Sequence, residues 1–298
     1  MRFKGLDLNL LVALDALLSE RNVSRSAKKL NIGQSATSDA LARLRDYFED
    51  ELLIHAGRQM VLTAQGQLLR DKVRNVLLEV DNTVVRRPVF DKALERRSVR
   101  ILVSDYVVVA GLAHAIEGLA EEAPGVSIVI EQPAENPAAR LARGEVDFLI
   151  MPDVYISTAN PSAKLFSDDY VVLMWEEKAI PGEGMSAEDF LDAPHVSLRF
   201  PTPTPSFDSW FLEVAGSRRR VEVTTGAFSN IPFLLIGTDC VSLMPRRLAI
   251  KYQELLPLKF IPCPIPIPPL EERIQWNRVA NKDGCLNWLR ARIMLALA

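Results

Sequence analysis

The chain has 298 residues, 48% of them hydrophobic, and a mean hydropathy of +0.07, which is enough apolar material for two or three domains with buried cores. Its longest uncharged run, residues 223–238, contains two glycines and a proline and is too short to span a bilayer. The first residues do not read as a secretory leader, and three widely spaced cysteines form neither a metal-binding pattern nor a disulfide framework. We therefore expect a cytoplasmic protein that needs no membrane, metal or cofactor.

Residues 22–45 read as two short helical patterns on either side of a turn at residues 31–33. The first pattern opens at Ser24, which we predict to be its N-cap, and the second opens at about Gln34. Thr37, Leu41 and Leu44 recur at helical spacing and predict the buried face of the second helix. Two short helices joined by a tight turn that contains glycine are typical of a helix-turn-helix.

The flanking segments extend this pattern to a winged helix-turn-helix over residues 1–63. Residues 8–18 carry the apolar stripe of a preceding helix, and residues 52–54 and 60–62 are two short apolar runs around a turn. Such a unit presents polar side chains to base edges and phosphates of double-stranded DNA, although an ordinary helical hairpin with a solvated face has the same periodicity. The predicted DNA-contacting residues are Ser24, Arg25, Gln34, Ser35, Thr37, Ser38, Arg43 and Arg45, with Arg58 at the tip of the wing.

The charge distribution fits this assignment. The net charge is −3, but residues 1–87 carry 14 Lys and Arg against 11 Asp and Glu, whereas residues 88–298 carry 21 against 27. An acidic C-terminal part would repel DNA and confine contact to the basic end.

A long helix is predicted next, over residues 64–87, with Thr63 as its cap. Leu69, Val73, Val76 and Val80 are spaced by four, three and four residues, and Thr83 continues the series, as in a coiled-coil seam. The seam indicates a homodimer, although the helix could instead pack on its own domain. Residues 88–98 read as a charged hinge linker that begins at a proline.

From residue 99 apolar strands alternate with helices, which predicts mostly parallel sheets and a two-lobed α/β sensor resembling a periplasmic binding protein. Lobe I is assigned to residues 99–169 and 275–298, and lobe II to residues 170–274. The chain would cross between them near Asp169 and Gln275. Residues 257–269 hold six prolines and are predicted to be an extended connection. The expected strands are 99–103, 126–131, 146–151, 170–175, 195–200, 221–225, 240–243 and 273–280, and the expected helices are 107–120, 137–143, 186–191, 207–215, 231–237, 245–252 and 284–297.

Ligands of such sheets bind outside the carboxyl ends of the strands, which selects a set of candidate effector-binding residues. Aromatic, aliphatic and hydroxyl groups together suit a flat molecule with phenolic or carboxylate edges, and an arginine at 246 or 247 could pair with a carboxylate. The candidates are Ser104, Asp105, Tyr106, Met151, Pro152, Phe200, Pro201, Thr202, Phe228, Ser229, Asn230, Ile231 and Arg247.

The order LDLNLLVALDALLSERNVSRSAKKLNIGQSATSDALARLRDYFEDELL…GR…LTAQG resembles the DNA-binding domain of LysR-type transcriptional regulators. Its opening is similar to that of the nodulation-regulator (NodD) group and its salicylate- and nitroaromatic-responsive relatives. Three later segments are similar to the corresponding segments of the same group: GEVDFLIMPDVYISTANPSAKLF, RRRVEVTTGAFSNIPFLL and MPRRLA. The chain departs from the family at Gly33 and Ser35, where the family usually has serine and proline, and at His55, where it has an arginine. Ser35 is then the alternative cap of the second helix.

The resemblance implies a regulator controlled by a small effector, flavonoid-like by analogy with the NodD group. It also implies a homotetramer of two dimers that works with RNA polymerase. The other hypothesis is an α/β enzyme that acts on aromatic compounds and carries a helical N-terminal domain. The sequence contains no G-x-S-x-G, P-loop or H-E-x-x-H motif, and its three histidines lie far apart, so the regulator is favoured.

Overall fold

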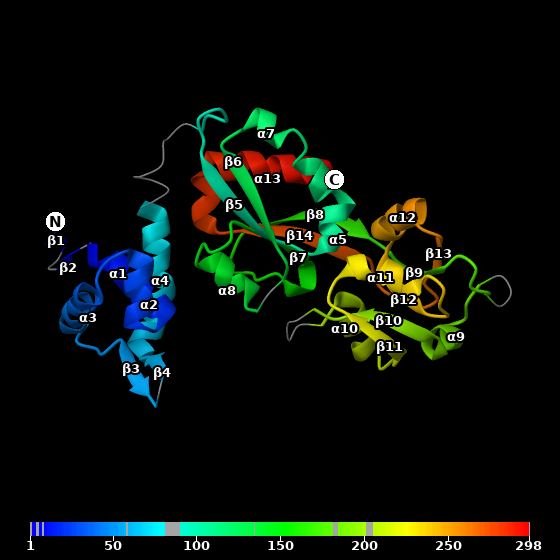
Figure 1. Cartoon of the computed structure of the whole chain (residues 1–298), viewed down its shortest axis with the longest axis horizontal. Coiled ribbons are helices and arrows are strands. Elements are labelled where there is room, and N and C mark those ends of the chain that lie inside the picture. Colours follow the sequence, from blue (N-terminus) through cyan, green and yellow to red (C-terminus); the bar gives the residue numbers. More distant parts are fainter. Residues whose placement is uncertain are drawn as a thin grey trace. The chain divides into compact units, whose positions relative to one another are not determined.

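The computed structural model describes residues 2–3, 6–7, 9–57, 59–80, 90–133, 135–180, 184–200 and 205–297, the first pair by their backbone alone. The chain forms two compact units, residues 1–89 and residues 90–298, with the short segment 142–144 grouped with the first. Figure 1 traces both units in colours that follow the sequence. Within the ranges given above, no helix combines the length and the apolar character that a membrane span requires.

Three helices form the centre of the N-terminal unit. Leu14, Leu17 and Leu18 on the first helix are fully buried and belong to one apolar cluster with Leu41 and Leu44 on the third. The second helix crosses both and buries Ala27. The elements up to this point are β1 Arg2–Phe3, β2 Leu6–Asp7, α1 Asn9–Glu20, α2 Val23–Leu30 and α3 Gln34–Phe48.

The caps of the two short helices differ from the prediction. The side chain of Asn22, not Ser24, caps α2 by accepting a hydrogen bond from the backbone N–H of Arg25 at 2.9 Å. Helix α3 begins after Gly33 and has no side-chain cap, so Ser35 does not take that role either. Asn22 precedes the helix in extended backbone, which places its side-chain oxygen over the free N–H groups, whereas Ser24 already lies inside the first turn.

The wing and the long helix follow as predicted. Strands β3 Leu53–Ala56 and β4 Gln59–Leu62 pair antiparallel, with Ile54 opposite Val61. The Thr63 hydroxyl accepts a hydrogen bond from Gly66 N at 3.0 Å and donates one to Asp50 at 2.6 Å, which confirms Thr63 as the cap of α4 Ala64–Val80. The remainder of the predicted helix, with Thr83, lies outside the described residues.

The predicted seam of α4 divides between two faces. Val73 is buried against the helices of its own unit, and Leu69 and Leu77 pack beside it. Val76 and Val80 instead remain 49% and 44% exposed. The helix therefore both packs on its own domain and carries an outward apolar edge.

Lobe I of the C-terminal unit is a five-stranded mixed sheet in the order β6-β5-β7-β14-β8. The first three strands are parallel, and β14 runs antiparallel to both of its neighbours. The strands are β5 Arg97–Leu102, β6 Val126–Glu131, β7 Phe148–Pro152, β8 Ser162–Asp168 and β14 Leu270–Trp276. The helical elements are α5 Asp105–Val107, η2 Val108–Leu112, α6 Ala113–Ala115, α7 Leu119–Glu122, α8 Pro137–Ala142, η3 Asp153–Tyr155, η5 Arg278–Lys282 and α13 Gly284–Leu297.

Lobe II repeats the arrangement in the order β11-β10-β12-β9-β13. Its first three strands are parallel, and β9 runs antiparallel to β12 and β13. The strands are β9 Tyr170–Trp175, β10 Pro194–Leu198, β11 Arg220–Thr225, β12 Val241–Pro245 and β13 Leu258–Pro262. The helical elements are α9 Ala187–Asp192, α10 Phe207–Val214, η4 Phe228–Asn230, α11 Ile231–Leu235 and α12 Arg246–Leu255.

Two crossings join the lobes, and one differs from the prediction. The chain passes from β8 to β9 at Asp169, as expected. It returns before β14 rather than at Gln275, because β14 pairs with β7 and β8 in the sheet of lobe I. Residues 270–274 therefore belong to lobe I, and part of the proline-rich connection forms β13.

The predicted helix over residues 107–120 is not one regular helix: α5, η2 and α6 follow one another directly, and α7 begins after a turn. The backbone departs from helical geometry at Gly111, where an added Cβ would lie 2.5 Å from the side chain of Leu297. Glycine thus lets α13 approach closely at this point.

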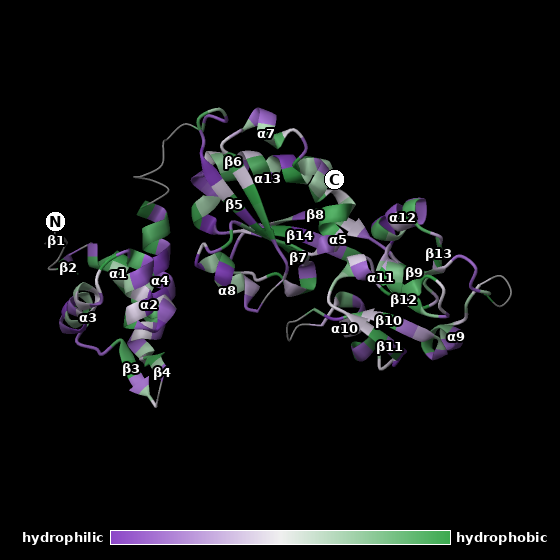
Figure 2. Cartoon of the chain, viewed as in Figure 1, coloured by the Kyte–Doolittle hydropathy of each residue, from purple (hydrophilic) through white to green (hydrophobic). Residues whose placement is uncertain are grey.

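Figure 2 shows α1 and β9 coloured mainly as hydrophobic, in agreement with their burial in the two units, whereas α3 carries many hydrophilic residues.

Candidate functional site

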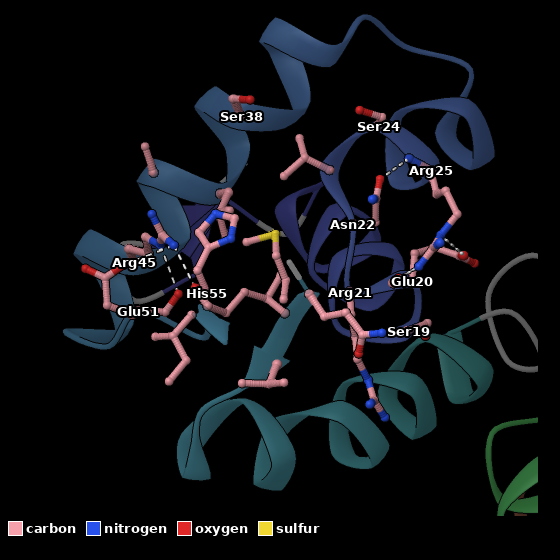
Figure 3. A pocket seen from close by; sticks show the side chains of 18 residues that line it. Ser19, Glu20, Arg21, Asn22, Ser24, Arg25, Ser38, Arg45, Glu51 and His55 are labelled. Carbon is pink, nitrogen blue, oxygen red and sulfur yellow. Dashed lines mark hydrogen bonds and ion pairs between the residues drawn. The ribbon is translucent and has the colours of Figure 1, made fainter. Parts of the chain in front are cut away.

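A groove in the N-terminal unit lies between the start of α2, one side of α3 and the wing. It encloses about 1080 Å³. Figure 3 shows Ser38 and Arg45 on α3, His55 on the wing, and Ser24 and Arg25 at the start of α2 around it. Hydroxyl, guanidinium and imidazole groups on three elements can all reach one polyanionic strand placed along the groove.

The arginines of the groove are held by contacts within the unit. Arg45 donates to the backbone oxygens of Glu51 and Leu53 at 2.9 and 2.8 Å and so ties α3 to the root of the wing. Arg25 donates to the carbonyl of Glu20 at 2.6 Å, while 64% of its side chain stays exposed. Both cations keep donors near the surface, which suits contact with phosphate oxygens.

The predicted DNA-contacting residues do not all lie together. Ser24, Arg25, Ser38 and Arg45 line the groove. Gln34 and Ser35 are exposed on the first turn of α3, outside the groove. Arg43 forms an ion pair with Asp7 at 3.0 Å, and this bond holds the pKa of the Asp7 carboxyl below its usual value.

Thr37 and Arg58 are special cases among these residues. Thr37 is fully buried and its hydroxyl donates to the carbonyl of Gly33 at 3.1 Å, so its inclusion among surface contacts is corrected. The same periodicity that groups Thr37 with Leu41 and Leu44 indicated this burial. Arg58 lies outside the residues that the structure describes.

The second site is a cavity of about 620 Å³ between the two lobes of the C-terminal unit. Lobe I contributes residues that follow β5 and β7, and lobe II contributes residues that follow β10 and β11, as the topology of such sheets predicts. Its lining residues are Ser104, Tyr106, Pro133, Glu135, Asn136, Pro137, Ala138, Ala139, Ile150, Met151, Pro152, Tyr155, Tyr170, Phe200, Pro205, Ser206, Phe207, Phe228, Leu270 and Glu272.

Aromatic rings form much of the cavity wall. The ring of Phe228 lies 5.6 Å from that of Tyr106 and 6.2 Å from that of Phe200, centroid to centroid. Tyr170 and Phe207 stack with an interplanar angle of 10°. Walls of this kind favour a flat, largely apolar ligand.

Two hydrogen bonds from tyrosines lie at the boundary between the lobes. The Tyr106 hydroxyl donates to the Asp168 carboxylate at 2.7 Å, and the Asp168 carboxylate also accepts from the backbone N–H of Arg247 at 3.0 Å. The Tyr155 hydroxyl donates to the carbonyl of Pro205 at 3.0 Å, and burial raises the pKa of Tyr155 to about 12. Both phenols stay protonated at neutral pH and act as donors.

Six of the predicted effector-binding residues line the cavity: Ser104, Tyr106, Met151, Pro152, Phe200 and Phe228. Asp105 points elsewhere, because its carboxylate accepts from the backbone N–H groups of Phe228 and Ser229 at 3.3 and 2.7 Å. Ile231 is fully buried in the core, and Asn230 donates to the Thr225 hydroxyl. Pro201 and Thr202 lie outside the described residues.

The two predicted arginines do not line the cavity either. The Arg247 guanidinium lies 4.5 Å from the centroid of the Phe166 ring, and that of Arg246 lies 5.9 Å from the Phe260 ring. The expected pairing of an effector carboxylate with Arg247 is therefore not supported by its position. At the lobe boundary Arg247 contributes its backbone N–H, which donates to the Asp168 carboxylate, and not its side chain.

Sequence reasoning missed Glu272, Tyr155, Tyr170 and Asp168 as site residues. Asp168, one of two adjacent aspartates that the sequence alone does not distinguish from solvated turn charges, is only 7% exposed at the end of β8. Glu272 lies between Leu270 and Ile274 on the buried face of β14, two residues from each. This spacing of two was the signal in the sequence that could have predicted its burial. The predicted strand began one residue too late to include it.

A winged helix-turn-helix joined to a two-lobed α/β domain with an interlobe cavity defines a bacterial regulator with a DNA-binding part and a ligand-binding part. The family models agree. Residues 8–67 match the bacterial regulatory helix-turn-helix proteins of the lysR family, and residues 92–294 match the LysR substrate binding domain. The chain belongs to the LysR family and is a DNA-binding transcriptional regulator.

Curated relatives narrow the resemblance within the family. The chain is 39% identical over 296 residues, 99% of its length and 87% of the relative, to nodulation protein D of Bradyrhizobium sp. (strain ANU 289). It is 40% identical over 292 residues, 97% and 93% of the two chains, to nodulation protein D 3 of Rhizobium meliloti (strain 1021). The family to which the chain belongs is one of regulatory proteins, so the alternative of an enzyme acting on aromatic compounds is dropped.

A solved structure supports the fold over the whole chain. The crystal structure of the probable transcriptional regulator PA0477 from Pseudomonas aeruginosa matches with a TM-score of 0.66 and 28% identity, covering 99% of each chain.

Proposed function

We propose that this regulator binds a small aromatic or phenolic effector between the lobes of its C-terminal domain and that the effector controls its action on DNA. The observation that carries the proposal is the cavity of about 620 Å³ lined from both lobes. Its volume falls within the range, roughly 300–1,000 Å³, of sites that enclose small organic ligands. Resemblance to the nodulation proteins favours a flavonoid-like compound, and the aromatic wall around Phe228 supports a flat ring system.

The DNA interface is proposed to combine base contacts from α3 with phosphate contacts around the groove. Gln34 and Ser38 are exposed on α3 and can hydrogen-bond to base edges, whereas Arg25 and the wing arginine Arg58 would contact phosphates. Gln34→Ala should then lower the discrimination between operator and random DNA by roughly 1–3 kcal/mol. Mobility shifts measure this difference, and an unchanged operator preference would show that α3 is wrongly assigned as the recognition helix.

Assembly is proposed to begin with a homodimer through α4, because Val76 and Val80 leave an apolar edge exposed on that helix. A dimer suits two-fold related half-sites on DNA. By family resemblance, two dimers join through their sensor domains into a homotetramer that works with RNA polymerase.

Effector control follows from the two crossings between the lobes. A ligand shifts the equilibrium between lobe arrangements only if it binds one arrangement more tightly than another. Contacts such as Tyr155 to Pro205 and Asp105 to Ser229 span the boundary and report the arrangement in which the lobes are closed. Effector binding would change the spacing of the DNA-binding pairs, and so the bending of DNA.

A thermal-shift screen of aromatic compounds against the full-length protein tests the proposal. A true effector raises the melting temperature with increasing concentration, because it binds the folded state alone. Ser104→Leu should abolish that shift, since Ser104 lines the cavity and the larger side chain fills it. Ser167→Leu, on the exposed side of β8, is the matched control. Compounds that stabilise the wild type and Ser104→Leu equally bind elsewhere and would refute the proposed site.

A further inference from the structure

The residues that line the interlobe cavity include a buried glutamate with an unsatisfied carboxyl oxygen. Glu272 on β14 is 2% exposed, and its Oε2 has no hydrogen-bond partner among the described residues. Buried polar atoms are nearly always paired, so an unpaired oxygen on a residue that lines a cavity marks a carboxyl group for which a ligand can supply the partner.

The charge of the cavity has one sign. Among its described lining residues, Glu135 and Glu272 are acidic and none is a lysine, arginine or histidine. Residues 134 and 201–204, which adjoin lining residues in the sequence, are alanine, prolines and threonines and add no charge. A carboxylate ligand would therefore lose its hydration in this cavity without gaining a cationic partner.

Burial also sets the protonation of Glu272. Loss of solvent, together with the negative charges of Asp153 and Asp168, raises the pKa of Glu272 to about 8. The other titratable groups that line the cavity are Glu135 and three tyrosines, Tyr106, Tyr155 and Tyr170. The tyrosines are neutral hydrogen-bond donors. At neutral pH the Glu272 carboxyl is thus both a hydrogen-bond donor and an acceptor, as a hydroxyl group on a ligand also is.

We propose that Glu272 determines the specificity of this cavity: it hydrogen-bonds to an uncharged hydroxyl group of the effector, and the lack of a cationic partner among the described lining residues disfavours ligands that present a carboxylate. The inference rests on the proposed function of the cavity and adds the chemical group by which the ligand is chosen. Aromatic walls hold the ring, and Glu272 selects its substituent. The effector class is therefore narrower than the phenolic or carboxylate compounds expected from the sequence.

Three ligands on one ring test this selection on the full-length protein. 2-Naphthol, 2-naphthoic acid and 2-naphthylmethylamine present a hydroxyl, a carboxylate and an ammonium group at the same position, and calorimetry measures their dissociation constants at pH 7. We expect 2-naphthol to bind at least about tenfold more tightly than 2-naphthoic acid, the difference made by one satisfied hydrogen bond. Equal binding of these two would overturn the inference. Tightest binding of the amine would also overturn it, because the cavity would then select a cation and not an uncharged hydroxyl group.

Two variants assign the selection to Glu272. Glu272→Gln keeps a donor and an acceptor and should retain the preference for 2-naphthol, whereas Glu272→Leu should lose about tenfold in affinity for it. Glu135→Gln removes the other acidic group, which is exposed, and should leave the preference unchanged. An unchanged ratio of the two dissociation constants in Glu272→Leu would show that this carboxyl does not select the ligand.

Ser104→Leu separates failure of this inference from failure of the proposed function. A probe that binds wild type and Ser104→Leu equally lies outside the cavity and refutes the proposed site. A probe that Ser104→Leu excludes but Glu272→Leu binds unchanged refutes only the role of Glu272. No binding by any of the three ligands would count against both.

Discussion

The contact between Asp105 and the backbone of lobe II gives a prediction about lobe closure. The Asp105 carboxylate follows β5 in lobe I, and it accepts hydrogen bonds from the N–H groups of Ser229 at 2.7 Å and Phe228 at 3.3 Å in lobe II. Asp105→Ala removes both acceptors. The lobes should then separate more readily at this edge, because no other described acceptor bonds to the Ser229 N–H.

The size of the effect follows from the geometry of the two bonds. The bond to Ser229 is short and charge-assisted, and such a bond contributes about 1.5–3 kcal/mol, while the longer bond to Phe228 adds little. This free energy corresponds to a roughly 10- to 150-fold change in the equilibrium between closed and locally open states. Asp105→Asn keeps one neutral acceptor and should lie between wild type and Asp105→Ala.

Amide hydrogen exchange at Ser229 measures this equilibrium directly. Its protection should fall roughly 10- to 150-fold in Asp105→Ala, whereas amides inside β10 should keep theirs. Asp91→Asn is the matched control, since it also removes a carboxylate that accepts a backbone N–H, here that of Ala93 at 2.9 Å. If Ser229 kept full protection in Asp105→Ala, the interlobe bond would not stabilise closure and the reasoning would fail.

Two further predictions concern assembly and pH. Val76→Asp with Val80→Asp should give monomers in light scattering, because carboxylates in an apolar interface are strongly disfavoured. Gln67→Asp, at an exposed position on the same helix, should leave the oligomer intact. An unchanged oligomer in the double variant would exclude α4 as the interface. The pKa of Glu272 in the folded protein is about 8, against an ordinary value of 4.5. Between these two pH values the folded protein holds a proton that the unfolded chain has lost. The free energy of unfolding should therefore fall as pH rises from about 4.5 to about 8 and then level off. Urea unfolding at pH 5.5 and 8.5 should show this loss, on the order of a few kcal/mol, reduced in Glu272→Gln, and an identical pH dependence in both proteins would count against a neutral Glu272.

Periodicity predicted most of the elements, and edge strands account for most of the omissions. The strands Val126–Glu131 and Tyr170–Trp175 and the helix Gly284–Leu297 have the predicted bounds. The missed strands β8 and β13 both lie at the edge of a sheet. Edge strands need neither continuous apolar runs nor every backbone N–H, so prolines such as Pro262 are tolerated there and conceal the strand in the sequence.

Residues of the candidate effector site were predicted by their position after a strand, which fixes the neighbourhood but not the direction of each side chain. Ser104 and Tyr106 face the cavity while Asp105 between them turns to lobe II, because successive residues at a helix start point in different directions. Glu272 comes from a strand on the other side of the second crossing. Its place in the cavity depends on the sheet order, and a single sequence does not contain that order in readable form.

The central position of β14 determines when the sheet of lobe I can be completed during synthesis of the chain. β14 fills the gap between β7 and β8, yet it is made about a hundred residues after β8 ends, a delay of roughly 5 to 20 s at ordinary rates of translation. All strands of lobe II are synthesised in that interval, so its sheet can close first. Until Trp276 has emerged, β7 and β8 each leave an edge unpaired, and such edges readily pair with other chains. A chain that stalls or is cut within the proline-rich segment before β14 would therefore be prone to aggregate, although its DNA-binding unit is already complete.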